Sequence, residues 1–162
     1  MDYKLKEFFF SVAEIRFYEA LKQVVGNKYL IFPKVRIADL VESSDLVQFN
    51  KVRGKHIDFT LLESGRKIKV KMLIELDDKT HNEPKRQTRD LEIDALFKAV
   101  GLPIAHIKVK PEYDLEEIRR ILKFTYNKSR RSKNSLSDLA VTLTADIPKP
   151  GQSNYEKQKE GL

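Results

Sequence analysis

The sequence contains no cysteine. This absence excludes a disulfide framework, a thiolate metal site and a cysteine nucleophile. Any bound metal ion must therefore be held by oxygen atoms or by histidine. The lack of thiols also makes the chain compatible with a reducing cytosol.

Long apolar runs are absent as well. The most apolar short run, Phe8-Phe9-Phe10, is flanked by Lys6 and Glu7 and is far too short to span a bilayer or to form the core of a signal peptide. We therefore expect a soluble protein that resides in the cytoplasm and has no membrane partner. A chain of 162 residues has room for one domain with a sizeable core and a tail.

Positive charge is plentiful. Lysine and arginine total 31 against 24 acidic residues, which gives a net charge of +7 and a pI near 9.5. This balance favours an anionic partner, most commonly nucleic acid. Beyond Tyr126 the apolar periodicity is lost and cations accumulate, so we predict one domain over 1–126 and a basic, mostly disordered tail over 127–162.

In two segments apolar and polar residues alternate, as they do in the strands of a hairpin. Residues 56–61 and 68–76 have apolar residues at alternate positions, and the stretch 63–66 between them has turn chemistry. A loose turn near 66–67 places Asp58 directly opposite Glu75, whereas a tight turn at 64–65 offsets the two by four residues. The second segment carries its charged residues on the other face: Lys69, Lys71, Glu75 and Asp77.

The acids of this hairpin permit two interpretations. Charged residues that alternate along a strand usually form a solvated face. Glu75 and Asp77, however, follow an apolar run at its carboxyl end, where open sheets tend to place their ligands. Together with Asp58 they offer oxygen donors suited to a hard divalent cation.

The segments before the hairpin are a helix, a strand and a loop. Ser11 opens the helix and Gly26 ends it, and Glu14 either closes a capping box with Ser11 or reaches toward a metal site. Tyr29 to Phe32 forms a strand that Pro33 breaks, followed by an irregular edge. The stretch 41–55 reads as a loop whose cations precede the Asp58 strand: Lys51, Arg53 and Lys55.

After the hairpin the periodicity is helical again. Pro84 starts a helix that ends at Gly101, with Ile93, Leu96, Phe97 and Val100 as its buried stripe. Residues 102–109 then form a strand, and a strand-helix-strand unit implies parallel pairing. A last amphipathic helix begins near Leu115, so the element order is α-β-β-β-α-β with a C-terminal helix.

This order, with Asp58 in the second strand and Glu75-Leu76-Asp77 in the third, resembles the PD-(D/E)XK, or restriction-endonuclease-like, nuclease superfamily. His81, Arg89-Asp90 and Gly101-Leu-Pro-Ile look like its very-short-patch-repair side, and like the bacterial domain of unknown function 2726 within it. The resemblance covers about residues 11–110. It implies an α/β fold with a three-layer α-β-α core and a mixed sheet.

The resemblance also implies a magnesium-dependent endonuclease that hydrolyses DNA, with manganese as an alternative ion. Asp58 and Glu75 match the two metal-binding acids, and Glu14 matches the acidic position on the first helix. Asp77, a further candidate ligand and catalytic residue, departs from the motif because it stands where the motif has lysine. Lys71, Lys79 or His81 could supply the missing function.

The remaining candidates would handle protons and phosphates. His81 would accept or donate a proton in catalysis, or else cap the loop before Pro84. Arg86 and Arg89 would contact phosphate, although Arg86 with Asp90 is also an ordinary helical ion pair. Other cations would hold the DNA backbone without reading sequence: Lys51, Arg53, Lys55, Arg130 and Arg131.

Three functional hypotheses follow. The first is the nuclease. The second, favoured by the missing motif lysine, is a non-catalytic nucleic-acid-binding module on the same fold. The third is a structural or partner-binding domain whose acids are merely solvated. Because many members of the resembled fold act as dimers, a homodimer is a further expectation.

Overall fold

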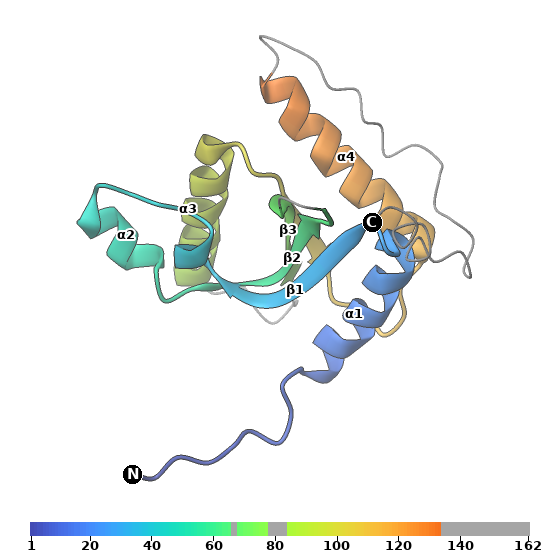
Figure 1. Cartoon of the computed structure of the whole chain (residues 1–162), viewed down its shortest axis with the longest axis horizontal. Coiled ribbons are helices and arrows are strands. Elements are labelled where there is room, and N and C mark those ends of the chain that lie inside the picture. The colour runs from blue at the N-terminus through green and yellow to red at the C-terminus, as the bar shows by residue number, and fades with distance from the viewer. Residues whose placement is uncertain (66–67, 78–83, 134–162) are drawn as a thin grey trace, which may run out of the picture.

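The computed structural model describes residues 1–65, 68–77 and 84–133 (Figure 1). One mixed sheet has the strand order β1-β2-β3-β4, with β4 parallel to β3 and the other neighbours antiparallel. Its strands are β1 (Tyr29–Arg36), β2 (His56–Glu63), β3 (Lys69–Asp77) and β4 (Ile104–Lys108). The helices are α1 (Val12–Val25), η1 (Ile37–Asp39), α2 (Leu46–Val52), α3 (Pro84–Val100) and α4 (Leu115–Lys133).

Helices cover both faces of this sheet. Figure 1 shows α3 on one side and α1 and α4 on the other. Phe17 of α1 and Ile118 of α4 pack with Phe59 of β2 in one buried cluster, while Phe97 of α3 packs with Leu73 of β3 in a second. The predicted α/β class with a mixed sheet is therefore confirmed, and the helices and sheet form three layers.

The first helix begins and ends where the sequence predicts. The Ser11 hydroxyl accepts from the Glu14 backbone N–H at 3.2 Å, and the Glu14 carboxylate accepts from the Ser11 N–H at 2.6 Å. This reciprocal pair is the capping box. At the other end Gly26 has φ 55°, a left-handed conformation that glycine adopts without steric cost.

Two predictions about the segment before the hairpin are wrong. Strand β1 does not break at Pro33 but continues to Arg36, because β1 is an edge strand and an edge tolerates a residue without an N–H donor. The stretch 41–55 is not all loop, because it contains α2. Asp45 caps this helix by accepting from the N–H groups of Val47 and Gln48 at 2.9 and 3.1 Å.

The hairpin adopts the looser of the two predicted registers. Phe59 pairs with Ile74 and Leu61 with Met72, but Leu62 pairs with Val70, so Lys71 is an extra residue in a bulge. The bulge breaks the predicted alternation. Val70 packs with the cluster of Leu73 and not, as predicted, with that of Met72 and Ile74.

The second half of the domain follows the predicted order with two corrections. Helix α3 starts at Pro84, and Gly101 follows it with φ 70°. Val100 is 53% exposed and so does not belong to the buried stripe. Helix α4 continues through Lys133, so the predicted domain end at residue 126 falls inside it, while 134–162 lie outside the described residues. Among the described helices, none is long and apolar enough to cross a membrane.

Candidate active site around Asp58 and Glu75

Two acidic residues meet on the central strands of the sheet. Asp58 and Glu75 each lie one residue beyond the pair of Phe59 with Ile74, so they stand at the same level of the two strands, and their side chains share a hydrogen bond. The Leu76 backbone N–H donates to Asp58 Oδ2 at 2.7 Å. The pairing of the two strands therefore brings the two side chains together. Each strand carries one of the acids, and the hydrogen bond from the Leu76 N–H orients Asp58.

The ionisation of this pair is set by its surroundings. Burial raises the pKa of Asp58, and this effect outweighs the opposing hydrogen bonds from the Leu76 N–H and from Glu75. The negative charge of Glu14 raises the Asp58 pKa further. Glu75 Oε1 is itself buried.

Glu14 forms the predicted capping box and has a second partner, Lys34. It closes the capping box, and its Oε1 and Oε2 also lie 3.0 and 3.1 Å from Lys34 Nζ. Burial raises the pKa of Glu14, but the hydrogen bonds from the Ser11 N–H and Lys34 outweigh it, so the pKa is lowered overall. Its charge still reaches Asp58.

Lys34 is a cation of the site that sequence reasoning missed. It stands between the pairs Pro33–Phe59 and Val35–Ile57, which places it opposite Asp58. Its Nζ lies 5.3 Å from the centre of the Phe9 ring. The strand pattern holds no signal for this neighbour, because only the pairing of β1 with β2 brings Lys34 to Asp58.

The carboxylate of Asp77 contacts a side chain that the sequence did not reveal as its neighbour. Its Oδ1 lies 3.2 Å from His106 Nδ1, and Asp94 Oδ1 lies 3.0 Å from His106 Nε2. Burial lowers the pKa of His106, but both carboxylates raise it and they prevail. The parallel pairing of Glu75 with His106 produces this cluster of β3, β4 and α3. The only signal of this cluster in the sequence was a histidine in the predicted parallel strand, at the level of the acids.

The donor set suits an ion that needs few protein ligands. In the part of the chain that the structure describes, no three His, Asp or Glu side chains are grouped so as to hold a metal ion. Magnesium is commonly bound by one or two carboxylates and completed by water and substrate phosphates. Asp58 and Glu75 fit that requirement, because both are oxygen donors already in contact.

The other predicted residues are less directly connected with the acid pair. Lys71, one of the residues predicted to compensate for Asp77, binds Glu63 at 2.8 Å toward the turn of the hairpin. Lys55 Nζ lies 4.0 Å from Glu92 Oε2, and Arg130 lies over the ring of Tyr126. Exposed cations at the end of α2 are Lys51 and Arg53. Outside the described residues or side chains lie Lys79, His81, Arg86, Arg89 and Arg131.

Fold and site together define a three-layer α/β domain with a partly buried acid pair in its sheet. The chain belongs to the family described as protein of unknown function (DUF2726), which matches residues 6–125. The predicted resemblance to that family is thereby confirmed. No curated protein and no solved structure matches the chain.

Proposed function

We propose that this domain is a metal-dependent nuclease that hydrolyses phosphodiester bonds of DNA. The observation that carries the proposal is the contact between the Asp58 and Glu75 carboxyl groups on neighbouring strands. Like-charged residues directly opposite each other on paired strands destabilise a sheet. Their contact favours a role in binding a cation over a purely solvated face.

Asp58 and Glu75 would hold Mg²⁺ or Mn²⁺. The other two predicted ligands have different partners, since Glu14 binds Lys34 and Asp77 contacts His106. When bound, such an ion supplies an activated water and relief of negative charge at the phosphate. The hydrolysis consumes one water and breaks one phosphorus–oxygen bond, leaving a phosphate monoester and a hydroxyl group. The Leu76 N–H, 2.7 Å from Asp58 Oδ2, would keep that carboxylate in place.

Proton transfer and DNA binding would fall to other groups. His81 is the proposed proton acceptor or donor, because imidazole exchanges protons near neutral pH. The net charge of +7 would attract the DNA backbone independently of sequence. A homodimer remains a prediction, which light scattering on the full chain would test.

A second candidate function is a non-catalytic module that binds nucleic acid. The observation in its favour is that Asp77, at the position of the motif lysine, bonds to His106 at 3.2 Å. That arrangement offers no lysine at the motif position. Binding without cleavage would still use the basic surface.

A nuclease assay separates the two candidates. Purified full chain is incubated with supercoiled and single-stranded DNA in Mg²⁺ or Mn²⁺. We expect cleavage by the wild type and a loss of about 100-fold or more in Asp58→Asn and Glu75→Gln, which keep the shape of each side chain but weaken metal binding. Glu63→Gln, an acid of the same hairpin that binds Lys71, is the matched control and should cleave normally.

Intact DNA in every reaction, with binding retained, would favour the non-catalytic module. Equal cleavage by wild type and both site variants would place any nuclease activity elsewhere or in a contaminant. Either result removes Asp58 and Glu75 from the proposed role.

A further inference from the structure

We propose that Lys34 is the phosphate-binding cation of this site and replaces the lysine that the motif has at the position of Asp77. The inference rests on the proposed function, since it assigns a residue to the same site. It is carried by the position of Lys34 opposite Asp58, by its backbone conformation and by the contacts of its ammonium group.

The backbone of Lys34 is in an unfavourable conformation. Its φ is 53°, and Lys34 is the one non-glycine residue with positive φ in the described part of the chain. Side chains with a Cβ disfavour this left-handed region. The pairs on both sides, Pro33–Phe59 and Val35–Ile57, keep the same register, so the conformation inserts no extra residue. Its structural effect is therefore to set the direction of the Lys34 side chain.

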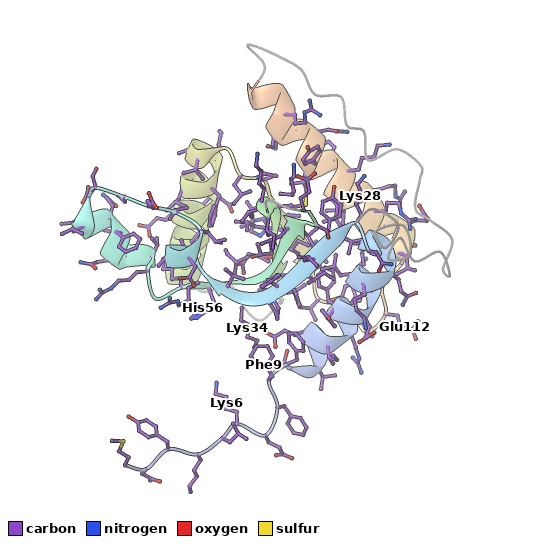
Figure 2. The ribbon with its side chains drawn as sticks, in the orientation of Figure 1. Lys6, Phe9, Lys28, Lys34, His56 and Glu112 are labelled. Carbon is purple, nitrogen blue, oxygen red and sulfur yellow. The ribbon has the colours of Figure 1, made fainter. Side chains whose placement is uncertain are left out.

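The ammonium group is held from two sides. Glu14 Oε1 lies 3.0 Å from Lys34 Nζ, and the Phe9 and Phe10 ring centres lie 5.3 and 6.0 Å away. Figure 2 shows Lys34 next to Phe9 beside β1, at the start of the first helix. A cation held by a carboxylate and by ring faces has a defined position. Glu14 is thus a positioning residue for Lys34.

Lys34 keeps capacity for a ligand. An ammonium group has three donors, and the contacts to Glu14 leave donor capacity for an oxygen of another group. The Lys34 side chain is 35% exposed, so solvent and a phosphate can reach it. Its positive charge also acts on the Asp58 carboxyl group. A phosphate between Lys34 and the acid pair would therefore meet a fixed cation.

Two other basic side chains of the sheet, Lys71 and His106, are paired with acids. Lys71 binds Glu63 at 2.8 Å, and His106 lies between Asp77 and Asp94. Lys34 differs because its acid partner, Glu14, belongs to the site itself. A matched control exists on the outside of α1. Lys22 also contacts one carboxylate, Glu19 at 2.9 Å, and one ring, Tyr18 at 5.1 Å.

The test compares Lys34→Met with Lys22→Met in the full chain. Binding of a fluorescein-labelled duplex and of a labelled single strand is measured by anisotropy over a range of salt concentrations, without a divalent cation. Loss of one phosphate contact should flatten the slope of log affinity against log salt by about 0.9 for duplex DNA or about 0.7 for a single strand. We expect this change in Lys34→Met and not in Lys22→Met.

Cleavage is measured in parallel at saturating DNA with Mn²⁺. We expect at least a tenfold slower rate for Lys34→Met and an unchanged rate for Lys22→Met. Lys34→Arg should restore the salt slope, because it keeps the charge. If the wild type binds DNA without cutting it, the proposed nuclease fails, yet the salt slope still tests Lys34.

A folding defect is controlled by Lys34→Gly, which removes the ammonium group and suits the left-handed backbone. Thermal melting identifies the variants that fold, and the binding comparison uses those. Equal salt slopes for folded Lys34 variants and Lys22→Met would overturn the inference, whatever the cleavage assay shows.

Discussion

The two ends of the β2–β3 hairpin carry opposite kinds of charge pair. Toward the turn, Lys71 Nζ binds Glu63 Oε2 at 2.8 Å, and both side chains are partly exposed. Toward the far end, the side chains of two acids, Asp58 and Glu75, share a hydrogen bond, and burial raises the pKa of Asp58. The same two strands thus hold an exposed pair of opposite charge and a partly buried pair of acids.

The two ends of the hairpin differ in what their charges contribute to stability. An exposed pair of opposite charges contributes a few tenths of a kcal/mol to stability, and like charges on paired strands cost a similar amount or more. The fold would lose little if Asp58 were uncharged. A buried acid with a shifted pKa is a feature of many binding and catalytic sites. The acid end of the hairpin is therefore where we propose the function.

The largest expected effect is metal stabilisation at the acid end. Mg²⁺ or Mn²⁺ should raise the thermal midpoint, because a ligand that binds only the folded state stabilises it by about 2.7 kcal/mol at a concentration 100 times its Kd. Differential scanning fluorimetry measures the shift. Glu75→Ala should abolish it and Lys71→Met, at the other end, should keep it. A shift that persists in Glu75→Ala would place the ion elsewhere.

Removal of the charge of Asp58 should stabilise the protein without metal. At pH 7, Asp58→Asn should raise the free energy of unfolding by up to about 1 kcal/mol. Burial raises the Asp58 pKa, so the folded wild type takes up a proton more readily than the unfolded chain. The cost of the Asp58 charge to the stability of the wild type therefore decreases as pH falls. It is fully removed below the pKa that Asp58 has in the unfolded chain. Urea denaturation at several pH values should show the advantage of Asp58→Asn shrinking on acidification.

The neighbouring His106 should show a smaller dependence on pH. Although burial opposes it, the pKa of His106 is raised by Asp94 and Asp77. Its stabilisation is full below the unfolded pKa and is lost as pH rises through the folded pKa. His106→Gln should therefore cost about 0.5 kcal/mol at pH 5, a value suited to a screened pair, and less at pH 9. An equal cost at both values, by urea denaturation, would show that charge plays no part.

The smallest effect is expected at the turn end of the hairpin. The hydrogen bond from Lys71 lowers the pKa of Glu63, so this pair stabilises the fold above the unfolded pKa of Glu63. Glu63→Gln should lower stability at pH 7 by a few tenths of a kcal/mol, with less effect in high salt. A stabilising effect like that of Asp58→Asn would remove the contrast between the two ends.

Much of the fold was predictable because the controlling interactions are local. The capping box at Ser11 and Glu14, the start of α3 at Pro84 and the stop at Gly101 depend on residues within one helical turn. The α2 helix was missed because it has only seven residues, although Asp45 caps it and Leu46, Phe49 and Val52 recur at helical spacing. The bulge at Lys71 was missed because alternation in sequence does not reveal an unpaired residue.

The candidate site was predictable only along one hairpin. Asp58 and Glu75 could be placed opposite each other because pairing parity and turn length leave few registers. The partners of the site come from other elements. Lys34 reaches Asp58 through the pairing of β1 with β2, and His106 meets Asp77 and Asp94 where β4 and α3 join β3.

The sequence by itself determined the order of the four strands and of the helices α1, α3 and α4, and it marked the two hairpin acids, since both depend on residue type and short spacing. Only the tertiary structure decided which charges surround those acids. Contacts between distant segments depend on strand pairing and helix packing, which no local pattern specifies. The cation beside Asp58 is for that reason Lys34, a residue that no motif marks.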